Sequence, residues 1–140
     1  MTLPYDEGYF DCIIYGDVLE HLVNPWGLLR EHNRLLRRGG VIICSIPNIL
    51  YFKVTSRLVY RGRWEYEDEG VLDRTHLRFF TRPSMERMIA DAGFVTTRMI
   101  RKPSCASWPK WLTTLTGNLL IDHLVRKYIF VAVKDRSLTE

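Results

Sequence analysis

Two short apolar runs dominate the hydrophobic pattern in the first third of the chain. Phe10–Tyr15 and Val41–Ser45 are rich in β-favouring residues, and uninterrupted runs of this length are typical of strands buried on both faces of a parallel sheet. The segment between them carries helix signals, because Asn24 can cap a helix, Pro25 suits its first turn, and the pair Gly39–Gly40 can end it. A strand, a helix and a strand in this order predict a βαβ unit whose two strands are parallel and adjacent.

The pattern continues through the second half of the chain. Residues 48–64 carry apolar side chains at near-helical spacing, which predicts a short amphipathic helix that ends at Gly62. Another helix should begin after Thr81 as its cap and end at Gly93, with a stripe that we assign to the core at Met85, Met88, Ile89 and Ala92. The remaining pattern predicts a strand, a helix and a last strand at Phe94–Ile100, Leu112–Val125 and Tyr128–Val133.

Short motifs follow one another over most of the chain: Leu3-Pro4, Phe10-Asp11, Asp17–Leu22, Leu35–Gly40, Ser45–Asn48, Asp73–Thr81 and Ala92–Phe94. Their order and spacing resemble the class I S-adenosylmethionine-dependent methyltransferases. The resemblance implies an α/β fold that forms the C-terminal half of a Rossmann-like seven-stranded sheet. It would contain strands four to seven, ordered four, five, seven, six, with the last strand antiparallel.

The glycine-rich loop and the ribose-binding acidic residue of that family have no counterpart in this sequence. We therefore expect residues 1–140 to form a single partial domain without the N-terminal cofactor-binding half. The implied cofactor is S-adenosylmethionine, and the residues that would touch it are Gly16, Asp17, Val18 and Leu19. We expect an enzyme in the full-length form and little cofactor binding by this chain alone. The alternative is a non-catalytic remnant or interaction module that retains the half-fold.

Asp17, Glu20 and His21 stand at positions i, i+3 and i+4 after the first predicted strand. A helical turn there would place the three side chains on one face, and the family topology brings His76 over the same strand ends. We identify His76 and His21 as candidate catalytic residues, and Asp17, Glu20, His21 and His76 as candidate ligands of a divalent metal. The set is similar to the Glu-x-x-Glu-His motif with a distant His in the ubiquinone-biosynthesis O-methyltransferases, with Asp17 in place of the first Glu.

In those enzymes, and in the small-RNA 2′-O-methyltransferases that share the pattern, the metal engages hydroxyls of the acceptor. Two alternatives stay open for the residues here. Asp17 can cap a helix, which is the common role of Asp at a helix start. His76 can be a lone general base or a hydrogen-bonded structural residue.

A further segment resembles methyltransferases found with surface-polysaccharide genes. Trp64 and Tyr66 would stack on a sugar ring, while Arg61 and Arg63 would meet a phosphate or carboxylate. The alternative is a lid loop that only covers the site. The resemblance implies O-methylation of a small-molecule or glycan acceptor.

The composition suits one domain with a packed core, because 46% of the residues are hydrophobic. Central strands are covered on both faces, so we expect almost complete burial of Ile13, Ile14, Ile43 and Phe130. The formal charge of +4 comes from scattered Lys and Arg, so we expect no nucleic-acid partner.

The cysteines Cys12, Cys44 and Cys105 lack metal-binding spacing. We interpret them as reduced residues of a cytoplasmic protein, with Cys12 and Cys44 in the core. No secretory signal begins the chain, and no apolar run is long enough to cross a bilayer.

The first predicted strand also suggests an assembly. In the family fold it pairs with a strand that this sequence lacks, so its outer edge would expose unpaired backbone groups. We expect a homodimer in which this edge pairs with its symmetry mate, or an edge covered by the segment Leu112–Val125.

Overall fold

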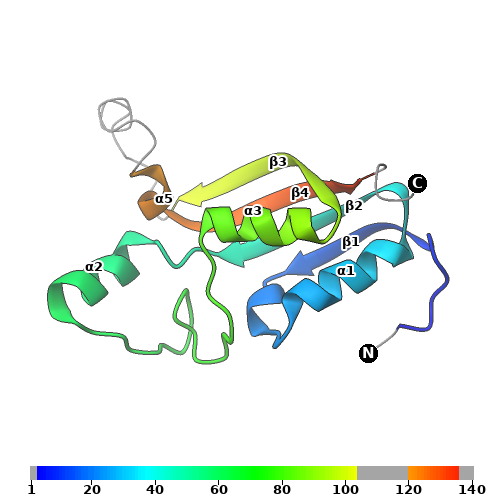
Figure 1. Ribbon diagram of the computed structural model, residues 1–140. Coiled ribbons are helices and arrows are strands. Elements are labelled where there is room, and N and C mark those ends of the chain that lie inside the picture. Colours follow the sequence, from blue (N-terminus) through cyan, green and yellow to red (C-terminus); the bar gives the residue numbers. More distant parts are fainter. Residues whose placement is uncertain (1–2, 104–119, 136–140) are drawn as a thin grey trace.

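The computed structural model describes residues 3–103 and 120–135. In these ranges one mixed sheet has the strand order β1-β2-β4-β3, with β1 (Phe10–Gly16), β2 (Leu36–Pro47), β3 (Phe94–Pro103) and β4 (Val125–Lys134) (Figure 1). β1 and β2 are parallel, and β4 runs antiparallel to both β2 and β3. The predicted α/β class, the parallel first pair and the antiparallel last strand between the second and third are confirmed.

Helix α1 (Pro25–Leu35) begins as predicted, since the Asn24 side chain accepts a hydrogen bond from the Gly27 amide at 2.9 Å. Its predicted end at Gly39–Gly40 is wrong, because the helix stops at Leu35 and β2 begins at once. Gly39 has a φ of 72° inside the strand, where the register with β1 shifts. The glycines therefore form a bulge in β2, a position that needs positive φ.

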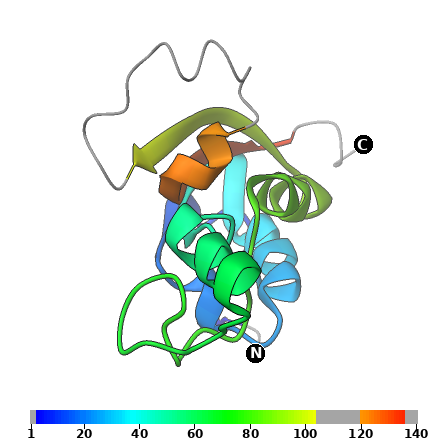
Figure 2. The same ribbon diagram turned by 90° about the vertical axis from the view of Figure 1, so that its left-hand side faces the viewer.

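Helix α3 (Arg82–Asp91) has the predicted Thr81 cap, which forms a capping box with Ser84. Gly93 follows the helix with a φ of 82°. The stripe predicted to be core is buried, at Met85, Met88, Ile89 and Ala92. Figures 1 and 2 show α3 beside α1 on the same face of the sheet, and buried side chains of both helices join those of β2 and β4 in one core cluster.

The opposite face of the sheet has no covering helix among the described residues. Burial along β2 alternates, with Ile42 fully buried and Ile43 half-buried. The predicted burial of four core residues is therefore right for Phe130 (0% exposed) but wrong for Ile14, which is 69% exposed, and for the half-buried Ile13 and Ile43. Cys12 is likewise exposed, whereas Cys44 is buried.

Helix α2 (Phe52–Arg61) ends at Gly62 in the left-handed conformation, as predicted. Val54 packs with Tyr51, Val71 and Leu72 in a small second cluster, but Leu58 and Val59 are exposed. Of the helix predicted at Leu112–Val125, residues 112–119 lie outside the described ranges. The remainder forms the short α5 (Ile121–Leu124), and Val125 already belongs to β4. Cys105 also lies outside the described ranges.

Candidate functional site

The carboxyl end of β1 leads directly into the candidate site. Asp17 follows the strand with a φ of 54°, a left-handed conformation that Asp tolerates better than most residues. Its backbone amide donates to Ser45 Oγ at 3.1 Å, and Ser45 Oγ donates to Asp17 Oδ1 at 2.8 Å. Lys127 Nζ donates to Asp17 Oδ2 at 2.5 Å. Asp17 therefore ties the end of β1 to β2 and β4.

The next residues form a short 3₁₀ helix, η1 (Leu19–His21), whose cap position is Val18 without a side-chain bond. Asp17 is therefore not its cap. The Glu20 carbonyl accepts hydrogen bonds from the amides of Leu77 and Arg78, at 2.8 and 2.9 Å. These bonds fix the loop that carries His76 against η1.

Glu20, His21 and His76 converge in this place. One ligand atom from each lies within 4.8 Å of the others, and His76 Nε2 is 4.0 Å from Glu20 Oε1. The three side chains, which we call the Glu–His–His triad, include the two histidines predicted as catalytic. Asp17 lies outside the triad, although it was predicted with it as a ligand.

The hydrogen bonds of the two rings select one tautomer. His76 Nδ1 contacts the Val71 carbonyl at 3.0 Å, and His21 Nδ1 contacts the Thr75 carbonyl at 3.2 Å and the Thr75 hydroxyl at 3.1 Å. That hydroxyl donates to Asp73 Oδ1 at 2.5 Å, so it can only accept from His21. A carbonyl only accepts, so Nδ1 carries the proton in each neutral ring and Nε2 keeps its lone pair. Histidines that bind metals are commonly oriented by such a carbonyl partner.

The Glu20 carboxylate is 1% exposed, and neither of its oxygens has a hydrogen-bond partner among the described residues. Burial raises the pKa of Glu20, and the charge of Asp17 raises it further. A buried carboxyl group without partners is costly. A bound cation would supply the missing partner, so the residues fit a divalent metal with one carboxylate and two imidazoles as ligands.

Asp17 behaves in the opposite way. Its partial burial opposes ionisation, but the hydrogen bonds from Lys127 and Ser45 outweigh this and lower the pKa of Asp17. Asp17 is thus a charged group with its own partners, whereas Glu20 is an orphaned one.

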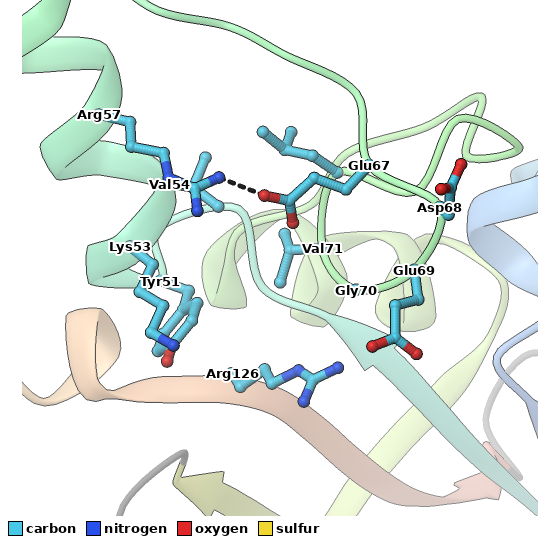
Figure 3. Close-up of a pocket in the computed structure, with 11 residues that line it drawn as sticks. Tyr51, Lys53, Val54, Arg57, Glu67, Asp68, Glu69, Gly70, Val71 and Arg126 are labelled. Carbon is cyan, nitrogen blue, oxygen red and sulfur yellow. Dashed lines mark hydrogen bonds and ion pairs between the residues drawn. The ribbon is translucent and has the colours of Figure 1, made fainter.

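The triad borders a cavity of about 250 Å³, which Asp17, Arg126 and Lys127 also line. A second cavity of about 440 Å³ shares Gly70, Val71 and Arg126 with it and extends toward α2 (Figure 3). Arg126 and Lys127 were missed by sequence reasoning. They come from the first residues of β4, and only the placement of β4 beside β2 brings them to the site.

The four residues predicted to contact the cofactor begin with the last residue of β1, Gly16, and continue directly after the strand. A Cβ atom on Gly16 would meet nothing within 4 Å, Val18 is 38% exposed, and Leu19 belongs to the core. This open space at the carboxyl end of the strand fits one wall of a nucleoside-cofactor site, the usual ligand position in α/β sheets.

The four residues predicted to contact the acceptor lie elsewhere. Trp64 and Tyr66 pack around Phe79, with ring centroids 5.3 and 6.3 Å from it, and both are at least 40% exposed. Arg61 and Arg63 are exposed. None of the four lines either cavity beside the triad.

The chain is similar in sequence to known methyltransferases. A family model described as a methyltransferase domain matches residues 2–98. Demethylmenaquinone methyltransferase from Staphylococcus aureus is 29% identical over 114 residues, which covers 71% of this chain and 46% of that protein. The chain therefore spans about half the length of the curated relatives it matches. Among the described residues, no helix is long and apolar enough to cross a membrane.

Solved structures of S-adenosylmethionine-dependent methyltransferases share the fold. The protein from Thermotoga maritima superposes with a TM-score of 0.64 at 15% identity, covering 95% of this chain and 60% of that one. The protein from Methanosarcina mazei gives 0.62 at 15% identity, covering 95% and 63%. Because the family model covers most of the chain and the fold agrees, this chain belongs to the class I S-adenosylmethionine-dependent methyltransferases.

Proposed function

We propose that the chain forms the acceptor side of an O-methyltransferase in which the Glu–His–His triad holds a divalent metal. S-adenosylmethionine would supply a methyl group activated on a sulfonium, and the metal would bind and acidify the acceptor hydroxyl. Gly16, Asp17 and Val18 would line one side of the cofactor, while Leu19, which is 0% exposed, would support them from the core. The acceptor would be a small molecule or a glycan.

The residues of this chain have separate tasks in that reaction. The carbonyls of Val71 and Thr75 accept the Nδ1 protons of His76 and His21, so the Nε2 atom of each ring presents its lone pair to a bound metal. Lys127 and Ser45 keep Asp17 charged beside the cavity, where it can orient an acceptor hydroxyl. If no metal binds, His76 Nε2 remains the group with the geometry of a general base.

The observation that carries this proposal is the buried Glu20 carboxylate, which accepts no hydrogen bond from the described residues and lies next to two correctly oriented imidazoles. An Asp, Glu or His that serves only structure usually has its hydrogen bonds satisfied inside the protein. The orphaned carboxylate is what distinguishes a metal ligand from a structural residue.

Titration of the metal-free protein with Co²⁺, followed by visible absorption, tests the metal site. We expect one ion per chain, and binding at least tenfold weaker in Glu20→Gln, His21→Ala and His76→Ala. His123→Ala on α5 is the matched control, since this histidine lies outside the triad. Asp17→Asn should bind Co²⁺ as the unchanged protein does, because Asp17 is not in the triad.

Unchanged Co²⁺ affinity in His76→Ala, with circular dichroism showing a folded variant, would refute the metal site. The alternative of a non-catalytic remnant predicts that no Co²⁺ binds at the triad. Little binding of S-adenosylmethionine is expected of this chain alone in either case, so the metal titration is the measurement that separates the two.

We also infer the assembly from the position of β1. This strand lies at one edge of the sheet, so its outer backbone groups are available to a second copy in a homodimer.

A cytoplasmic location and a glycan-stacking role for Trp64 and Tyr66 remain predictions of the sequence.

A further inference from the structure

The larger of the two cavities has the size of a ligand site. Its volume of about 440 Å³ falls in the range that binds small molecules. One wall is apolar and formed by Tyr51, Val54, Val71 and Leu72. The other walls carry charged side chains from α2, the loop 67–70 and β4 (Figure 3).

Three of the six charged side chains that line the cavity are already paired. Arg57 forms an ion pair with Glu67, drawn as a dashed line in Figure 3. Asp68 pairs with Arg74 at 2.7 Å. Within residues 3–103 and 120–135, no carboxylate lies within 4.0 Å of the Lys53 ammonium or the Arg126 guanidinium. Lys53 and Arg126 therefore line the cavity without an ion-pair partner in the described part of the chain.

Arg126 also connects the two cavities, since it lines both the larger one and the one that contains the triad. Gly70 stands at the same junction with a φ of 102°. A side chain there would approach the Arg126 guanidinium and the Glu67 carboxylate, at 4.0 and 3.8 Å from its Cβ. These are ordinary contact distances, so the positive φ, and not the available space, favours glycine here. Because Arg126 lines both cavities, a ligand held by Arg126 can extend to the triad.

The cavity also offers one free acid. In Figure 3 the Glu69 carboxylate points from its loop toward Arg126, and among the described residues it has no ion-pair partner. A carboxylate beside a guanidinium suits a ligand that presents hydroxyl donors next to an anionic group. A purely anionic ligand would be repelled by Glu69, and a neutral one would leave both cations unpaired.

We propose that the acceptor is a polyhydroxylated molecule with an anionic group, such as a sugar acid or a sugar phosphate. Arg126 and Lys53 bind the anionic group, Glu69 accepts from a neighbouring hydroxyl, and another hydroxyl reaches the triad. This inference rests on the proposed function, because the triad is taken as the place where the acceptor hydroxyl is methylated. It assigns the recognition of the anion to Lys53 and Arg126 instead of Arg61 and Arg63.

Ligand-detected NMR on the metal-free protein at low ionic strength tests the charge preference. The probes are galacturonate, galactose 1-phosphate and neutral galactose. We expect at least one of the two anions to bind about tenfold more tightly than galactose, because each charge-assisted contact is worth roughly that factor. The better anion identifies carboxylate or phosphate as the group that Arg126 receives.

Variants locate the effect. Arg126→Gln and Lys53→Gln should each remove most of the preference for the anion. Arg87→Gln, an exposed arginine on α3, and Arg61→Gln should leave it intact. Equal binding of all three sugars, no binding of either anion, or an unchanged preference in Arg126→Gln would overturn the proposal.

The experiment separates this inference from the proposed function. An Arg126-dependent anion preference in a protein that binds no Co²⁺ supports the acceptor site and refutes the metal. Co²⁺ binding at the triad without any anion preference supports the metal site and refutes the proposed acceptor site.

Discussion

Glu20 and Asp17 show how two carboxylates three residues apart acquire opposite properties. Both lie at the end of β1 and line one cavity. Asp17 receives hydrogen bonds from Ser45 and Lys127, whereas the Glu20 oxygens receive none among the described residues. The different surroundings therefore make Asp17 a group that stays charged and Glu20 a group that is costly to ionise.

The free energy of unfolding should reveal the cost of Glu20. Its folded-state pKa is raised, so its contribution to stability is full below the ordinary Glu pKa of about 4.3 and is lost as the pH rises through the raised value. In the presence of a chelator, Glu20→Gln should stabilise the protein at pH 8 by about 1 kcal/mol. Urea midpoints at pH 4 and pH 8 measure this. A variant that is destabilised more at pH 8 than at pH 4 would contradict the orphaned carboxylate.

Asp17 should show the opposite pH dependence. Its folded-state pKa is lowered, so its contribution is present above the ordinary Asp pKa of about 3.9 and is lost as the pH falls through the lowered value. Asp17→Asn should destabilise the protein at pH 7 by less than about 1 kcal/mol, because the pair with Lys127 is partly exposed. The same urea series should show this loss shrinking toward pH 3. A loss that grows on acidification would exclude the ion pair as its cause.

At the scale of single elements, helix starts were predictable and one helix end was not. The caps at Asn24 and Thr81 act within three residues, so the local sequence contains the whole interaction. The glycines after Arg38 have two uses, since positive φ suits both a helix end and a strand bulge. The bulge forms because β2 pairs with β1 on both sides of the glycines. That pairing joins residues far apart in the sequence, so the local sequence does not contain it.

The local sequence also could not predict which of the two faces of the sheet is buried. The apolar runs of β1 and β2 indicate a parallel sheet, but which side chains point toward α1 and α3 depends on strand orientation. Ile42 points to the covered face and Ile43 to the open one.

This pair of isoleucines gives a matched test within one strand. Ile42→Ala should lower the free energy of unfolding by about 2–5 kcal/mol, the usual cost of a cavity in a packed core. Ile43→Ala should cost clearly less, since the half-buried side chain leaves no enclosed cavity. Urea denaturation of both variants measures the difference. Equal losses would mean that the second face is covered as fully as the first.

The reactivity of Cys12 and Cys44 tests the same difference between an exposed and a buried position in the sheet. Burial raises the pKa of Cys44 to about 12, and the thiolate is the reactive form. In a Cys105→Ser background, a thiol reagent at pH 8 should modify Cys12 rapidly and Cys44 only after unfolding, a difference of at least tenfold in rate. Mass spectrometry of timed samples identifies the modified residue. Rapid modification of Cys44 under native conditions would contradict its place in the core.

At the scale of the whole molecule, the fold brought together residues that the sequence could only partly assign. Glu20, His21 and His76 were identified because a resemblance supplied the distant histidine. Lys53 and Arg126 carried no signal, since single basic residues are common on any surface. Their position depends on α2 and β4 meeting beside the triad, which is a property of the topology and not of a motif.

The edge position of β1 leads to the last prediction. An exposed strand edge with free backbone groups favours pairing with another chain, and Ile14 and Cys12 add exposed apolar surface to that strand. A two-fold axis would pair two β1 strands antiparallel and make the contact self-complementary. Light scattering should therefore give twice the chain mass at micromolar concentrations.

Ile14→Lys should shift the protein to the monomer, because the symmetric contact would bring two ammonium groups close together on an apolar surface. Val59→Lys on α2 is the control, since that side chain is equally open, at 74% exposure against 69% for Ile14, and lies away from β1. It should leave the mass unchanged. A monomer in the unsubstituted protein, or a dimer that persists in folded Ile14→Lys, would show that β1 does not form the interface.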